Sequence, residues 1–118
     1  MPAASIRSEK TNMAPEIKFD KYQFASQAKA VKATQQVRDR HPLKTPIRDR
    51  ADHEFINALF CQHPDYESKV AGRLVGYYEV HPNVGDTRCF YAIFVGGGMI
   101  DFSFYKAIEA VAKRNKIT

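Results

Sequence analysis

Tryptophan is absent from this 118-residue sequence, and only two cysteines are present. Cys61 and Cys89 lie far apart, in a predicted helix and a predicted strand, without the spacing of a disulfide framework, so both are predicted to be buried thiols. Cys61 and His63, with Cys89 or His81, are the candidate ligands of a zinc site, but their spacing is not a zinc pattern and paired CxxC elements are missing. We therefore expect no metal and no cofactor.

Long apolar runs are missing as well. No run approaches the roughly 18 residues that a membrane span needs, and the first residues lack the apolar stretch of a secretory signal. The sequence also has no phosphate-cradling GxxxxGK[ST] loop. Ser103, His63 and Asp101 are the residue types of a catalytic triad, but Ser103 fits better as a helix cap. We expect a cytoplasmic protein that is not an enzyme and has no membrane partner.

What the sequence does have is an ample core and an uneven charge. Hydrophobic residues make up 44% of the chain, with eight Phe and six Tyr, which is enough for one domain. The net charge is +5, and residues 1–50 hold eleven Lys and Arg against five Asp and Glu, whereas residues 51–118 hold seven against eight. A positive field concentrated in one half of a chain favours polyanionic partners.

Hydrophobic periodicity predicts the elements of the first half. Residues 1–14 have no apolar period and are expected to be a flexible tail, and residues 15–118 to form a single domain. Alternation around residues 17–19 predicts a short edge strand. A helix is predicted from Phe24 to the His41-Pro42 pair, with Phe24, Ala28 and Val31 on its core face.

The rest of the chain predicts an α+β fold: a three- or four-stranded, mainly antiparallel sheet with helices packed on it. Asp49 is the expected N-cap of a second helix with a core stripe from Phe55 to Phe60, and a short helical turn follows. Three strands come next, the middle one nearly continuous in apolar residues and therefore central, with a hairpin at Gly96–Gly98. Ser103 is the expected N-cap of a final helix.

Basic residues cluster on one face of the predicted first helix. Lys29, Lys32 and Arg40 fall within about 80° of one another at 100° per residue, and Lys44, Arg48 and Arg50 follow in the next loop. Such a stripe is either a solvated helix face or a surface that contacts phosphates without reading sequence.

Three groups of residues resemble the defective-chloroplasts-and-leaves domain family over about Ile17 to Val111. They are His63-Pro64 with Lys69 and Gly72, then Thr87-Arg88-Cys89-Phe90, then Asp101-Phe102-Ser103 with Lys106. That family occurs in plant plastid proteins, at the C-termini of plant-specific nuclear RNA polymerase large subunits and as small bacterial proteins. The resemblance implies an α+β fold and an association with RNA metabolism, particularly ribosomal RNA maturation. It supplies no established catalytic residues.

A second cationic set overlaps these family residues. The predicted fold gathers Lys69, Arg73, Arg88 and Lys106 near the sheet and the start of the last helix, where they suit phosphate contact. The structural alternative is a cross-strand ion pair between Arg88 and Asp101 that fixes the strand register. Some aromatic residues are further candidates for stacking on unpaired bases, although most are expected in the core: Tyr77, Tyr78, Phe90, Tyr91, Phe94 and Tyr105.

The expected function is a non-enzymatic RNA-binding accessory domain in ribosomal RNA processing or maturation. RNA is the expected partner, bound through Lys29, Lys32, Arg40, Lys69, Arg73, Arg88 and Lys106. The alternative is a protein-interaction module that docks onto an RNA-processing or transcription assembly through exposed aromatics.

Overall fold

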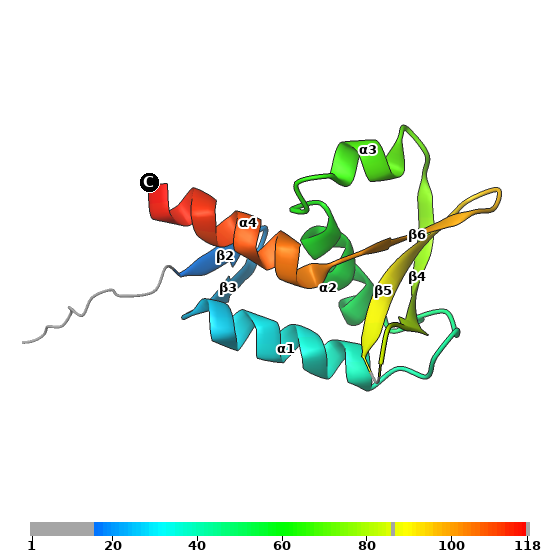
Figure 1. Ribbon diagram of the computed structural model, residues 1–118, viewed down its shortest axis with the longest axis horizontal. Helices are drawn as coiled ribbons and strands as arrows, with labels where there is room; N and C mark the ends of the chain where they lie inside the picture. Colours follow the sequence, from blue (N-terminus) through cyan, green and yellow to red (C-terminus); the bar gives the residue numbers. More distant parts are fainter. Residues whose placement is uncertain (1–15, 86, 118) are drawn as a thin grey trace, which may run out of the picture.

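The chain has an α+β fold, as predicted, in a computed structural model that describes residues 16–85 and 87–117 (Figure 1). The predicted tail at residues 1–14 lies outside the described residues. In chain order the elements are β2 (Ile17–Phe19), β3 (Tyr22–Phe24), α1 (Gln27–Asp39), α2 (Arg50–Phe60), α3 (Tyr66–Val70), β4 (Val75–Pro82), β5 (Arg88–Phe94), β6 (Met99–Phe102) and α4 (Phe104–Ile117).

The main sheet has three antiparallel strands in the order β4-β5-β6. The apolar strand β5 is central, as its composition predicts. The β5–β6 hairpin turns at Gly96, Gly97 and Gly98, whose φ angles of 90°, 114° and 89° are unfavourable for any residue with a Cβ. The hairpin places Phe102, at the end of β6, directly opposite Phe90, near the start of β5.

The helices cover one face of this sheet and leave the other uncovered (Figure 1). Along β5, buried Phe90, Ala92 and Phe94 alternate with half-buried Tyr91 and Ile93, as expected for a strand with one covered face. On the covered side α1 packs against β5, α2 against β4, and α4 against both α1 and α2.

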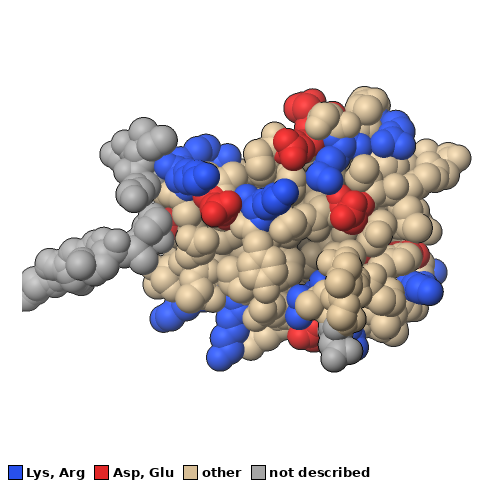
Figure 2. Space-filling view, in the orientation of Figure 1, with Lys and Arg blue, Asp and Glu red and all other residues tan. Residues whose placement is uncertain are grey.

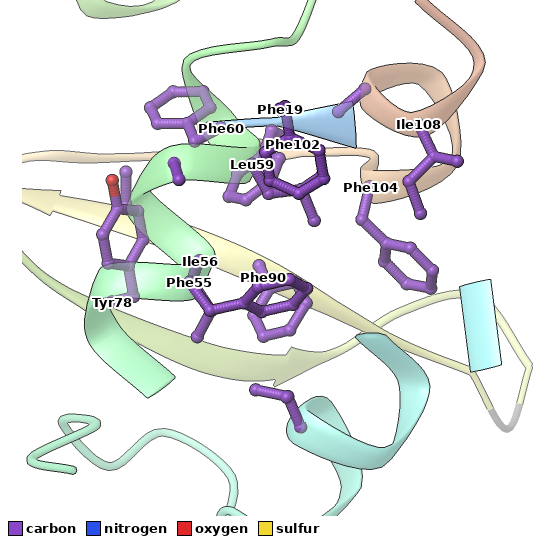
Figure 3. Close-up of a cluster of buried hydrophobic side chains, with 14 of the residues drawn as sticks. Phe19, Phe55, Ile56, Leu59, Phe60, Tyr78, Phe90, Phe102, Phe104 and Ile108 are labelled. Atoms are coloured by element: carbon purple, nitrogen blue, oxygen red, sulfur yellow. The ribbon is translucent and has the colours of Figure 1, made fainter. Parts of the chain in front are cut away.

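Aromatic rings form the centre of the core (Figure 3). Phe102 stacks between Phe60 of α2 and Phe90 of β5, with ring centroids 4.4 and 5.8 Å apart. The Tyr78 ring is fully buried beside them, and its hydroxyl donates to Asn57 Oδ1 at 2.7 Å. The predicted apolar stripe of α2 is confirmed, because Phe55, Ile56, Leu59 and Phe60 are all buried.

The predicted N-terminal strand is present as β2, but it lies outside the main sheet. Instead of forming an edge of the main sheet, β2 pairs with β3 in a separate two-stranded sheet, with Phe19 opposite Tyr22. Asp20 makes the tight turn possible by adopting φ = 52°, a left-handed conformation that Asp tolerates better than most residues. Phe24 therefore ends a strand rather than starting a helix.

Helix α1 begins at Gln27, where the Ser26 hydroxyl accepts the amide of Lys29. Its predicted core face is confirmed only in part: Phe24 and Val31 pack against the core, but Ala28 is exposed, and the buried side chains of the helix are Ala30, Thr34 and Val37. Alanines lie on several faces of this helix, so the apolar period in the sequence is weak. Packing of α1 against both α4 and β5 then decides which face is buried.

One of the two cysteines is also placed differently from its prediction. Cys61 is exposed because it is the C-cap residue of α2, directly beyond the buried stripe, and Cys89 is half-buried. Both thiols are free. No helix within residues 16–85 and 87–117 has the length and apolar character that crossing a membrane requires.

Candidate nucleic-acid interface

Two of the three groups of family residues meet in one cavity of about 230 Å³, here called the signature pocket: the group that begins at Thr87 and the group that begins at Asp101. It forms where the start of β5, the end of β6 and the start of α4 converge, because the hairpin register places Phe90 opposite Phe102. The residues that line it are Arg38, Asn83, Thr87, Arg88, Cys89, Asp101, Phe102, Ser103, Phe104 and Tyr105.

Two guanidinium groups line the signature pocket, and they have different surroundings. Arg38 Nε donates to Asp39 Oδ1 at 2.8 Å, and this hydrogen bond lowers the pKa of the Asp39 carboxyl. The charge of Arg38 is therefore largely balanced. The Arg88 guanidinium forms no ion pair or hydrogen bond with any other described residue, so Arg88 remains available to an anionic ligand.

The cross-strand ion pair between Arg88 and Asp101 does not form. Asp101 lies opposite Tyr91, and the β-sheet partner of Arg88 is Pro82 on the other neighbouring strand. Of the two interpretations of Arg88, the structural one is thus wrong for this pairing. Strand register is instead fixed by the covered apolar face of the sheet.

Lys69 closes the free edge of the sheet. Residues Leu43 to Ile47 cover the outer edge of β4, through hydrogen bonds from the Lys44 amide to Val80 O and from the Ile47 amide to Tyr78 O. Within residues 16–85 and 87–117, no such segment pairs with the outer edge of β6, and there the Lys69 ammonium donates to Asp101 O at 3.0 Å. A lysine at an edge strand discourages further strand pairing, so Lys69 has a structural role.

His63 is buried beneath the signature pocket, with its ring 6.5 Å from that of Phe102. Its Nδ1 accepts the Asp65 amide at 3.0 Å. Burial lowers the pKa of His63, and the positive charges of Lys69 and Lys106 add to this effect. The imidazole of His63 therefore packs edge-on against Phe102, one of the residues that line the pocket, and is held in its neutral form.

The residues of a catalytic triad are not assembled in the described parts of the chain. The Ser103 hydroxyl accepts the Lys106 amide at 3.3 Å, which confirms the predicted N-cap of α4. No hydrogen bond joins Ser103 to His63 within residues 16–85 and 87–117. Those residues also contain no group of three or more His, Cys, Asp or Glu side chains that could hold a metal ion.

Arg40 and Arg73 are engaged within the protein. Arg40 forms a two-point contact with Asp52, from Nε to Oδ2 at 2.9 Å and from Nη2 to Oδ1 at 2.6 Å. Arg73 donates to the carbonyls of Val70 and Lys69 at the end of α3, and its guanidinium lies 3.9 Å from the centroid of the Phe94 ring. The structure thus separates these two arginines from the other candidate cations.

The remaining cations are open to solvent. Lys29 and Lys32 on α1 and Lys106 on α4 are exposed, and none forms an ion pair with another described residue. Figure 2 shows Lys and Arg side chains along α1 and over α4, with acidic side chains interspersed among them and near α3. Tyr105 lies between the two helices, 49% exposed, and its hydroxyl accepts a hydrogen bond from Gln35 Nε2 at 2.9 Å.

Sequence reasoning missed Arg38 as a pocket residue. It belongs to no family group and lies on α1, far in sequence from the strands that form the pocket. The aromatic candidates divide as expected, since Tyr78, Phe90 and Phe94 are core residues and Tyr77 and Tyr105 are exposed.

Comparison with known proteins gives three related matches. Residues 35–108 match the family described as "Protein of unknown function (DUF3223)". The chain is 32% identical over 81 residues to "Protein DCL, chloroplastic" of Solanum lycopersicum and 34% identical over 80 residues to "Protein DCL homolog, chloroplastic" of Arabidopsis thaliana. These alignments cover 64% and 63% of this chain but only 36% of each plant protein.

A solved structure shares the fold. The solution NMR structure of an uncharacterized protein from Rhodospirillum rubrum aligns with a TM-score of 0.72 and 26% identity, over 83% of this chain and 92% of that one. The matched family residues 35–108 include every residue that lines the signature pocket, the end of α1 and the start of α4. The chain therefore belongs to the DUF3223 family and is a DCL-like protein.

Proposed function

We propose that this protein is a non-enzymatic RNA-binding accessory domain that acts in ribosomal RNA processing. The observation that supports this proposal best is the exposed cations on α1 and α4, together with Arg88 in the signature pocket. Lys29, Lys32 and Lys106 are exposed, and Arg88 lines the pocket without a hydrogen bond or ion pair to a carboxylate in the described chain, although its charge also acts on Asp39. Lysine and arginine side chains in this arrangement suit contacts to a sugar-phosphate backbone.

The surroundings of the pocket support binding rather than catalysis. Ser103 caps α4, and the Nδ1 atom of His63 is occupied by a backbone amide, so neither side chain is placed as a nucleophile or a general base.

Salt-dependent RNA binding tests the proposal. Fluorescence anisotropy with labelled RNA should show affinity that falls steeply as salt rises, because binding to phosphates releases counterions. Lys32→Glu should weaken binding more than Lys18→Glu, a control that changes the net charge equally at an exposed residue of β2. Absence of binding at low salt, or equal effects of the two variants, would contradict the proposal.

A second candidate function has its own structural support. Leu74, Val95 and Met99 are 71%, 63% and 52% exposed and lie at the hairpin end of the sheet, where the Val95 amide donates to Leu74 O. An exposed apolar patch of this kind is typical of protein interaction sites. Under this alternative the domain docks onto an RNA-processing or transcription assembly through that patch.

A pull-down at low and moderate salt separates the two functions. RNA recovered at low salt and lost at moderate salt supports direct RNA binding. A protein partner that is retained at moderate salt, and lost with Val95→Lys but not with Lys32→Glu, supports the docking function instead.

A further inference from the structure

A second and larger cavity lies at the outer edge of β4, away from the signature pocket. Its volume is about 510 Å³, within the range of roughly 300–1,000 Å³ that is typical of small-molecule sites. No residue lines both cavities. The side chains that matter here come from the α1–α2 loop, α2 and β4: Pro46, Arg48, Arg50, His53 and Tyr77.

Backbone contacts hold the walls of this cavity in place. The Ile47 amide donates to Tyr78 O at 2.9 Å and fixes the loop against β4. The Asp49 carboxylate accepts the Asp52 amide at 2.9 Å and fixes the first turn of α2. Arg48 and Arg50 therefore leave the chain between two anchored points, and a ligand would meet a largely preformed site.

The charge of the cavity is positive. Two arginines and His53 line it, and its lining contains no carboxylate among the described residues. The Arg48 side chain forms no ion pair or hydrogen bond within the described chain. Arg50 contacts Glu54 at 3.3 Å, but its side chain is 91% exposed, and exposed pairs of this kind are weak and screened by salt. Both guanidinium groups are thus available to an anion.

Tyr77 gives the cavity an aromatic wall. It lies on the uncovered face of the sheet, next to a β-bulge between Val75 and Tyr77, and is 37% exposed. Its ring contacts no other aromatic ring or cation in the described chain. The neighbouring Tyr78 is instead fully buried in the core. An aromatic side chain beside arginines combines base stacking with phosphate contact.

We propose that this cavity binds one unpaired base of a single-stranded RNA, with Tyr77 stacking on the base and Arg48 and Arg50 contacting the flanking phosphates. The proposal rests on the RNA-binding function above and adds to it a site that distinguishes single strands with bases from other polyanions. Arg48 and Arg50 recognise charge alone, whereas Tyr77 responds only to the base.

Two probes with the same sugar-phosphate chain test this site on the full-length protein. One is a short single-stranded RNA, and the other is its abasic counterpart, with anisotropy measured at the same salt. We expect the wild type to prefer the RNA by about fivefold or more, as one stacked base contributes. Tyr77→Leu should abolish the preference, and Tyr77→Phe should retain it. Arg48→Gln with Arg50→Gln should weaken both probes equally.

Tyr105→Leu is the matched control, because Tyr105 is the other half-exposed tyrosine but stacks on Phe104 at 4.3 Å. It should leave the preference intact. Loss of the preference with Tyr105→Leu, or its survival in Tyr77→Leu, would overturn the proposed base site while RNA binding itself stands. Wild-type protein that binds neither probe would overturn the RNA-binding function, and the base site with it.

Discussion

The two ends of the loop between α1 and α2 carry basic residues with opposite surroundings. At the α1 end, Arg40 and His41 both contact Asp52, the latter from Nε2 to Oδ2 at 2.7 Å. At the α2 end, Arg48 and Arg50 line a cavity that contains no carboxylate among its described residues. One basic stretch of sequence thus supplies both a structural contact and a candidate binding surface.

The difference depends on a single buried carboxylate. Asp52 lies in the first turn of α2 with a side chain only 7% exposed, so its charge requires partners, and Arg40 and His41 provide them. The neighbouring carboxylate, Asp49, accepts the Asp52 amide as the cap of the helix. Among the described residues, it forms no ion pair with Arg48 or Arg50. Basic residues that are adjacent in sequence therefore do not form one functional unit.

Of the substitutions that test this difference, Asp52→Ala should lower stability the most. It leaves Arg40 and His41 without their acceptor and should lower the free energy of unfolding by about 2–3 kcal/mol. Urea denaturation of the variant and the wild type measures the difference. Glu54→Ala, also on α2 but with the exposed partners Lys21 and Arg50, should change stability far less. Equal losses of unfolding free energy in the two variants would show that the buried Asp52 stabilises the protein no more than the exposed Glu54 does.

Acid should remove the Asp52 contribution in a defined pH range. The hydrogen bond from Arg40 is the main cause that lowers the pKa of Asp52 below its ordinary 3.8 in the folded state. Because the folded pKa is the lower one, the stabilisation is fully present above pH 3.8 and is lost as the pH falls through the folded value. The difference in melting temperature between wild type and Asp52→Asn should narrow in that acidic range. A difference that stays constant there would mean that ionisation of Asp52 is not its source.

Arg40→Gln should mainly lower stability, whereas Arg48→Gln should mainly reduce the salt dependence of RNA binding. Both effects should be smaller than that of Asp52→Ala. Arg40→Gln should lower stability by about 1 kcal/mol, since its side chain is 58% exposed and the ion pair is partly screened, and should leave the salt dependence of RNA binding unchanged. Arg48→Gln should change stability by less than about 0.5 kcal/mol and reduce the slope of log affinity against log salt by about 0.7. Thermal melts and anisotropy at several salt concentrations measure both properties.

Local signals in the sequence were sufficient for much of the fold. The stripe from Phe55 to Phe60, the cap at Asp49 and the glycine hairpin each carry a strong pattern, and the structure confirms them. The β2–β3 hairpin was not predictable in the same way, because it depends on Asp20 adopting a positive φ angle. The core face of α1 also depends on packing against α4 and β5, which periodicity does not encode.

The candidate sites were predictable only in part. The family residues identified the signature pocket, since the hairpin brings Thr87–Phe90 beside Asp101–Ser103. Which cations are paired was not evident, because Asp52 reaches Arg40 across a loop. The cavity beside Tyr77 joins residues about 30 positions apart, and no motif links them.

The placement of Lys69 at the outer edge of β6 has a consequence for self-association. A strand with open hydrogen-bonding groups can recruit a strand of another molecule, and this sheet has one edge covered by residues 43–47 and the other closed by a single ammonium group. Acetylation of that amine would remove the positive charge that disfavours strand pairing at this edge. The Lys69 contact is therefore one feature of this edge that disfavours pairing with a strand of another molecule.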